Sequence, residues 1–128
     1  MDTRQLIEAY VVAASDKDFD RLEQLIHPDA TFDGTVQTQA RGAEAFANGF
    51  RNLGPIYERY EVRQVIVEER NAAVLYEFVT DTTAGNVLSA EFLTTDGERI
   101  TSSTLLFDWR HWPEVIAELK VRRERIPA

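Results

Sequence analysis

The chain has 128 residues, a length that fits one domain with its own hydrophobic core. It is 44% hydrophobic and 28% charged, like an ordinary globular protein, and its formal net charge is −8. This charge argues against a nucleic-acid partner, because phosphate binding requires clustered cations. Cysteine is absent, which excludes disulfides, thiolate catalysis and sulfur-based zinc sites.

The sequence also gives no sign of a metal, a cofactor or a membrane. The only two histidines, His27 and His111, are far apart, and no HxxxH spacing occurs. We therefore expect neither a metal site nor an organic cofactor. The N-terminal stretch MDTRQLIEAY lacks the features of a signal peptide, and no apolar run approaches the roughly 20 residues of a membrane span. We expect a cytoplasmic protein.

Three helices are predicted in the first half of the chain. The first begins at Asp2 or Thr3 and runs to about Ala14, with apolar residues at helical spacing. The second begins within SDKDFD and ends before Pro28, since the residue that precedes a proline disfavours helical geometry. The stretch ATFDGTV then alternates like a short strand. The third helix spans AEAFANGFRNL, although a glycine inside it costs about 1 kcal/mol relative to alanine.

From Tyr57 onward the chain is rich in β-branched and aromatic residues. Four strands are predicted in YEVRQVIVEE, NAAVLYEFVTD, VLSAEFLTT and RITSSTLLFDW, with turns between them. The tail, WPEVIAELKVRRERI, fits either a helix or a half-buried strand, and we favour the strand. Its KVRRER run is then the exposed face of that strand rather than an anion-binding patch.

This order of elements predicts an α+β domain over residues 1–128. A strongly curved antiparallel sheet would wrap around the three N-terminal helices in a cone. We expect the concave side to leave an apolar hollow in which a ligand binds.

Several segments, in this order, resemble the nuclear transport factor 2-like superfamily. They are Tyr10 in the first amphipathic helix, the SDKDFDRLEQLIHPDATF run, the ARGAEAF entry to the third helix and the DGERI hairpin. The superfamily has a cystatin-like fold and includes SnoaL-like polyketide cyclases, ketosteroid isomerase and scytalone dehydratase. The resemblance covers nearly the whole chain and implies a homodimer with a deep, mostly apolar pocket. It implies no single reaction, because such folds carry many functions.

The ketosteroid isomerase pattern combines a tyrosine on the first helix, a carboxylate base on the following strand and a protonated acid on a late strand. Tyr10 matches the tyrosine. When the segments are matched at Pro28-Asp29-Ala30, however, Gly34 stands at the base position. Asp33 lies one residue earlier and therefore points to the opposite face of the strand. The late strand, TSSTLLF, holds no acid, so the resemblance does not support the isomerase mechanism.

Other polar residues remain as candidates. Tyr10 either donates a hydrogen bond to a ligand or is a core tyrosine bonded to the backbone. Asp108 is the best remaining catalytic acid, but we favour a pairing with Arg110 or a role in the turn around it. His27 is interpreted as a partial cation at a helix C-terminus.

Two glutamates lie in otherwise apolar strands. If Glu77 or Glu91 faced inward, loss of water would raise its pKa and make it a plausible base. We favour positions on the outer side of the sheet, with pairing across strands to Arg63 or Arg99.

The expected function is that of a small dimeric protein that binds a hydrophobic small molecule. It would act as a cofactor-independent isomerase, dehydratase or cyclase by proton transfer, as a non-catalytic binding module, or as a dimeric assembly domain. The residues expected to line its pocket are Tyr10, Phe32, Gly34, Phe46, Phe50, Tyr76, Phe92, Leu105 and Trp109, with Trp109 at the mouth.

Overall fold

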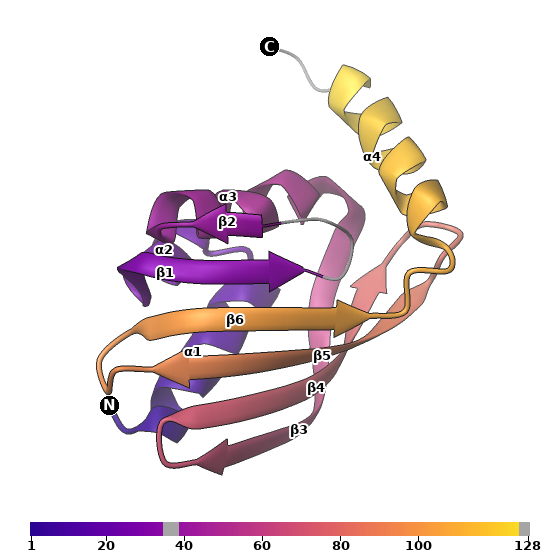
Figure 1. Cartoon of the computed structure of the whole chain (residues 1–128). Helices are drawn as coiled ribbons and strands as arrows, with labels where there is room; N and C mark the ends of the chain where they lie inside the picture. Colours follow the sequence, from indigo (N-terminus) through magenta and orange to yellow (C-terminus); the bar gives the residue numbers. More distant parts are fainter. Residues whose placement is uncertain (35–38, 126–128) are drawn as a thin grey trace.

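The computed structural model describes residues 1–34 and 39–125, and it has the predicted α+β architecture (Figure 1). The part of ATFDGTV beyond Gly34 lies outside the described residues. The elements, in chain order, are α1 (Thr3–Ser15), α2 (Phe19–Gln24), β1 (Ile26–Gly34), β2 (Gln39–Arg41), α3 (Ala43–Leu53), the short 3₁₀ helix η1 (Gly54–Ile56), β3 (Tyr57–Glu68), β4 (Asn71–Thr80), β5 (Asn86–Thr95), β6 (Ile100–Phe107) and α4 (Trp112–Arg125).

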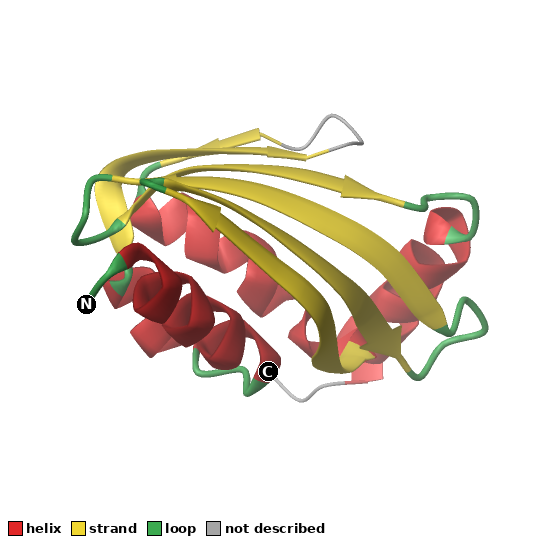
Figure 2. Cartoon of the chain, turned by 90° about the horizontal axis from the view of Figure 1, so that it is seen from below, coloured by secondary structure: helices red, strands yellow, loops and turns green. Residues whose placement is uncertain are grey.

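The six described strands form one curved sheet in the order β2-β1-β6-β5-β4-β3. The helices lie on its concave side, as the sheet arches over them in Figure 2. The prediction of an entirely antiparallel sheet is wrong at one pair, because β1 runs parallel to β6. A parallel pair requires a long crossover, and here α3 and the β3–β5 meander together supply it.

The second helix ends earlier than predicted, and Pro28 does not terminate it. α2 ends at Gln24 because the chain joins the sheet directly after it. The Ile100 amide donates a hydrogen bond of 2.8 Å to the Leu25 carbonyl, and β1 begins at Ile26. Pro28 instead lies inside β1, where the register with β6 is irregular between Ile26 and Thr31. A proline is tolerated at such a point because it has no amide to offer the ladder.

His27 is therefore on a strand rather than at a helix end, so its predicted role as a partial cation there is wrong. Its Nδ1 accepts a hydrogen bond from the Asp29 amide over 3.0 Å, and its Nε2 lies 4.0 Å from Asp96. The ring thus sits beside the hairpin between β5 and β6.

The tail is a helix, so the preference for a strand is wrong. Trp112, Val115 and Leu119 follow helical spacing and turn inward, and the last two are buried. Trp112 packs against Phe107, with ring centroids 4.8 Å apart. The helical period prevails over the strand period because α4 packs on η1, and its Trp112 on Phe78 and Phe107 of the sheet, instead of adding a strand.

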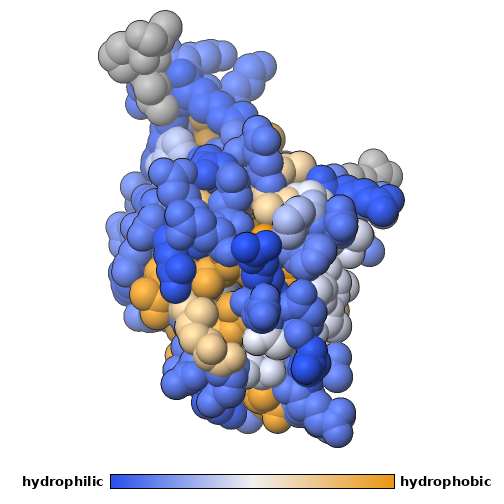
Figure 3. All heavy atoms as spheres, turned by 90° about the vertical axis from the view of Figure 1, so that its left-hand side faces the viewer, coloured by the Kyte–Doolittle hydropathy of each residue, from blue (hydrophilic) through white to orange (hydrophobic). Residues whose placement is uncertain are grey.

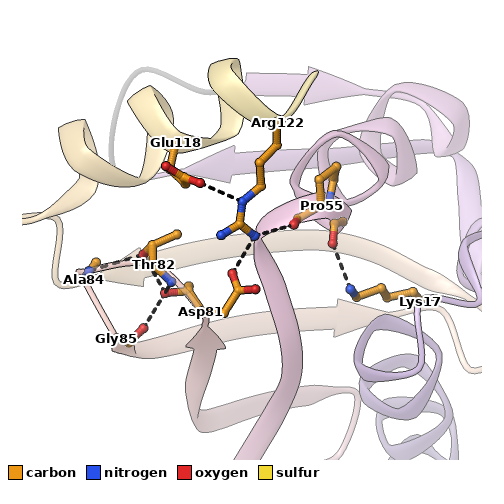
Figure 4. A network of polar contacts seen from close by, with 10 residues as sticks. Lys17, Pro55, Asp81, Thr82, Ala84, Gly85, Glu118 and Arg122 are labelled. Atoms are coloured by element: carbon orange, nitrogen blue, oxygen red, sulfur yellow. Dashed lines mark hydrogen bonds and ion pairs between the residues drawn. The ribbon is translucent and has the colours of Figure 1, made fainter. Parts of the chain in front are cut away.

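Arginines of the KVRRER run attach α4 to the body of the protein (Figure 4). The Arg122 guanidinium donates to Asp81 over 2.5 Å, to the Pro55 carbonyl over 2.8 Å and to Glu118 over 3.0 Å. Arg123 donates to the Asn52 carbonyl over 2.9 Å. Arg122 and Arg123 thus belong neither to an exposed strand face nor to an anion-binding patch, because they bind other parts of this chain.

Buried side chains of α1, α2 and α3 and of the concave sheet face form one core. In the described part of the chain, no helix is long and apolar enough to cross a membrane. The face seen in Figure 3 is mainly hydrophilic, with hydrophobic patches between the polar residues.

Candidate ligand pocket and a buried glutamate

A pocket of about 540 Å³ lies between α3, the concave face of the sheet and the start of α4. The concave positions of β4, β5 and β6 form one wall, and one side of α3 forms the wall opposite. The side chains that give the pocket its apolar character are Phe32, Phe46, Phe50, Leu53, Phe78, Val87, Leu105, Phe107 and Trp112. The polar side chains of the wall are Tyr60, Tyr76 and Ser89 on the sheet, Gln39 and Arg41 on β2, and Asn48 and Asn52 on α3.

Most of the residues expected around the hollow are part of this pocket, while their role in ligand binding stays a prediction. Those in the wall are Phe32, Gly34, Phe46, Phe50, Tyr76 and Leu105. Gly34 pairs with Leu105 across β1 and β6, whereas Asp33 is exposed. Gly34 thus lines the pocket and Asp33 does not, while the match of Gly34 to the base position of the isomerase pattern stays a prediction.

Phe92 and Trp109 do not line the pocket, contrary to expectation. Phe92 is 49% exposed on the convex face of β5, because the residue before it, Glu91, faces inward. Trp109 is 57% exposed in the connection that follows β6. Trp112, three residues later, takes the predicted place at the pocket wall.

Glu91 is the acid that sequence reasoning placed on the wrong face. It is 1% exposed at the centre of the concave side. Its Oε2 accepts hydrogen bonds from the Tyr10 hydroxyl over 2.5 Å and from Ser103 over 2.7 Å, and its Oε1 accepts one from Tyr76 over 3.3 Å. Tyr10, Glu91 and Ser103 lie behind the pocket wall, while Tyr76 is part of it. Tyr10 is therefore neither bonded to the backbone nor in the pocket wall.

The sequence contains a weak signal for this arrangement. β5 alternates Val87, Ser89, Glu91 and Leu93 with Leu88, Ala90 and Phe92, so either set can face a core. The presence of Tyr10 on an inward helix face, which needs a buried partner for its hydroxyl, favours the set that contains Glu91.

Burial dominates the electrostatics of this group. It raises the pKa of the Glu91 carboxyl above its ordinary value, and the hydrogen bonds from Tyr10, Ser103 and Tyr76 oppose that rise. Burial, followed by the charge of Glu91, also raises the pKa of the Tyr10 and Tyr76 phenols. Both tyrosines are therefore hydrogen-bond donors at neutral pH, not phenolates.

The other titratable candidates lie outside the pocket. Asp108 is at the surface, where hydrogen bonds from Arg110 hold the pKa of its carboxyl at about 2, and it is not a plausible general acid. Glu77 pairs with Arg63 across strands over 2.9 Å, as predicted. Within residues 1–34 and 39–125, no three His, Asp or Glu side chains are grouped so that they could hold a metal ion.

Comparisons with known proteins agree with this architecture. An NTF2-like protein of unknown function from Cytophaga hutchinsonii superposes with a TM-score of 0.77 at 19% identity, over 89% of this chain and 96% of the other. A candidate SnoaL-like polyketide cyclase from Shewanella denitrificans gives 0.73 at 13% identity, over 91% and 97%. A candidate ketosteroid isomerase from Kribbella flavida gives 0.73 at 14% identity, over 83% and 77%.

At these identities the structural matches show a shared fold. No curated protein sequence matches the chain. The family model of the SnoaL-like domain matches residues 7–103, which takes in the elements from α1 to the first half of β6. The chain therefore belongs to the SnoaL-like domain family.

Proposed function

We propose that this protein binds a hydrophobic small molecule in the pocket between α3 and the concave face of the sheet. The pocket itself carries the proposal: its volume of about 540 Å³ is within the range of small-molecule sites. Its walls are largely aromatic and aliphatic, with a few hydroxyls grouped on one side. A ligand that fits would gain mainly from burial of apolar surface.

Gly49 supports the same proposal from the opposite wall. It lies inside α3, where glycine costs about 1 kcal/mol relative to alanine. A Cβ added there would meet no atom within 4 Å, so the backbone does not require glycine for close packing. Glycine at this position leaves open space in the pocket instead.

A thermal unfolding screen tests this proposal. Steroids, terpenoids and aromatic polyketides would be added to the full chain, and the change in Tm recorded. A compound at ten times its Kd stabilises the folded state by about 1.4 kcal/mol, which is readily detected. No shift with any member of the panel would contradict the proposal.

We propose, as a second function, proton transfer on the bound molecule without an organic cofactor, of the isomerase, dehydratase or cyclase type. Glu91 favours it, since its carboxyl lies one hydroxyl away from the pocket, behind Tyr76. The test is incorporation of deuterium from D₂O at the α-carbon of bound hydrophobic ketones that also carry a hydroxyl group, followed by NMR. Exchange that is faster than in buffer, and that is lost in Glu91→Gln, would support proton transfer. Exchange at the same rate as in buffer would contradict it and favour a non-catalytic binding module.

We further propose that the convex face of the sheet pairs with a second copy of the chain. Four exposed apolar residues, here called the convex patch, support this: Ile66, Leu88, Phe92 and Leu106, each about half exposed. Ile66 lies on β3, Leu88 and Phe92 on β5, and Leu106 on β6. Ala73 of β4 pairs with both Ile66 and Phe92, so these three residues form one row across the sheet. Together they form an apolar surface that a second sheet can cover.

The test is the mass in solution of Phe92→Glu, measured by light scattering. In a dimer, the two sheets would bury the introduced carboxylate without a partner of opposite charge, which is unfavourable. We therefore expect the Phe92→Glu variant to be monomeric and the unaltered chain to be dimeric. Ile116→Glu is the matched control, since it puts the same charge on an exposed apolar position of α4. The proposal would be contradicted if the unaltered chain were monomeric, or if the Phe92→Glu variant stayed dimeric.

A further inference from the structure

Two hydroxyls lie side by side in the wall of the pocket. Tyr76 on β4 and Ser89 on β5 are direct cross-strand partners, and both line the cavity. They are also nearly fully buried, with exposed fractions of 2% and 4%. The hydroxyl of Tyr60, in the same wall, donates a hydrogen bond to Tyr76 and so joins this polar group. Aromatic and aliphatic side chains make up much of the remaining wall.

Each of these hydroxyls has already committed its only proton to another group of the protein. The Tyr76 hydroxyl donates to Oε1 of Glu91 over 3.3 Å, and the Ser89 hydroxyl donates to the Val87 carbonyl over 3.1 Å. A hydroxyl has one proton and two acceptor lone pairs. The Tyr76 oxygen already accepts one hydrogen bond, from Tyr60, so it retains one acceptor position, and the Ser89 oxygen also retains the capacity to accept.

The environment of Glu91 holds the Tyr76 proton in place. The Glu91 carboxyl already receives two short hydrogen bonds, from Tyr10 and Ser103, at its other oxygen. If Tyr76 turned its proton to a ligand, Oε1 would lose the bond that this phenol supplies inside a buried site, which is costly. Rotation of the hydroxyl toward the pocket is thus disfavoured.

We propose that the pocket selects hydrophobic alcohols and phenols, whose hydroxyl donates a hydrogen bond to the oxygens of Tyr76 and Ser89. This inference rests on the proposed binding function and specifies its ligand class. A ketone or an ether of the same size offers only acceptors to two oxygens that have no proton to give. An unsubstituted hydrocarbon leaves those oxygens buried without the bond that a donor supplies.

The charge pattern of the wall agrees with a neutral donor. Among the described residues of the wall, Arg41 is the only charged one, and it is an exposed residue of the edge strand β2. The described wall residues include no carboxylate that could pair with an ammonium group, since Glu91 lies behind Tyr76. A hydroxyl matches the two acceptors without burying a new charge.

Three probes that share one ring system test the inference: naphthalene, 2-methoxynaphthalene and 2-naphthol, which offer no oxygen, an acceptor only and a donor. Their Kd values for the full chain would be measured by fluorescence titration. We expect 2-naphthol to bind about tenfold more tightly than 2-methoxynaphthalene, the effect of one additional satisfied hydrogen bond. In Tyr76→Phe this preference should fall to about twofold or less, with the affinity for naphthalene retained.

Controls keep the outcomes distinct. Tyr57→Phe removes another buried phenol hydroxyl, one that donates to the Ala14 carbonyl and is not in the pocket wall, and should leave the preference intact. If Tyr76→Phe does not fold, Ser89→Ala gives the same test at the neighbouring oxygen and should weaken the preference. Equal affinity for the three probes, or tighter binding of the ether, would overturn the inference and leave the binding proposal standing. Failure of all three to bind would count against the binding proposal itself.

Discussion

The Tyr10 hydroxyl of α1 donates a hydrogen bond of 2.5 Å to the carboxyl of Glu91 at the centre of β5. This contact joins the first helix to the middle of the sheet, behind the pocket wall. Both side chains are buried, and Ser103 and Tyr76 complete the set of donors around the carboxyl. Glu91 thus joins the helix layer to the sheet, and its carboxyl is hydrogen-bonded to Tyr76 of the pocket wall.

Replacement of Glu91 by alanine should destabilise the fold. It leaves the hydroxyls of Tyr10, Ser103 and Tyr76 buried without their acceptor, at a cost of about 3 kcal/mol in total. The free energy of unfolding from urea denaturation measures this loss. Glu77→Ala is the matched control, because its cross-strand ion pair with Arg63 lies at the surface and should contribute less than about 1 kcal/mol. Equal effects of the two substitutions would contradict the account of the buried network.

The pH dependence of stability should carry the signature of a raised pKa. Burial raises the pKa of Glu91 in the folded state above the ordinary value of 4.5. The folded state therefore binds this proton more tightly than the unfolded chain. The resulting stabilisation is fully present below pH 4.5 and is lost as the pH rises through the folded-state pKa.

Comparison with Glu91→Gln isolates that contribution, because the amide does not titrate. We expect the unfolding free energy of the unaltered chain, relative to the glutamine variant, to fall as the pH is raised from 4.5. A difference that is flat, or that grows with pH, would mean that the folded protein does not raise the pKa of Glu91.

Arg122 should control the attachment of α4. Arg122→Ala removes the bonds to Asp81, Pro55 and Glu118, and we expect α4 to detach more often, at a cost of about 1 kcal/mol. Amide hydrogen exchange in residues 112–125 measures this opening. Arg125→Ala, at an exposed position of the same helix, should leave exchange unchanged. Similar exchange in the two variants would show that Trp112, Val115 and Leu119 hold the helix by themselves.

The sequence was sufficient for the fold class, the third helix and the four-stranded meander, because each follows from a strong local pattern. The inward position of Gly34 came from the family resemblance, through the match at Pro28-Asp29-Ala30. It failed where two patterns competed. In the tail, helical and strand periods coexist, and packing of Val115 and Leu119 against the body decides for the helix. In β5 both faces carry apolar residues, so only the partner that Tyr10 requires distinguishes the inward position of Glu91 from that of Phe92.

The most direct test of the pocket as a ligand site is the Kd of 2-naphthol for the unaltered chain and for Gly49→Trp, measured by titration calorimetry. The indole would occupy the open space beside Gly49 without disturbing a close backbone contact. We predict measurable binding to the unaltered chain and at least a roughly tenfold loss in a folded Gly49→Trp variant. Equal affinity of the two proteins would place the ligand elsewhere and contradict the account.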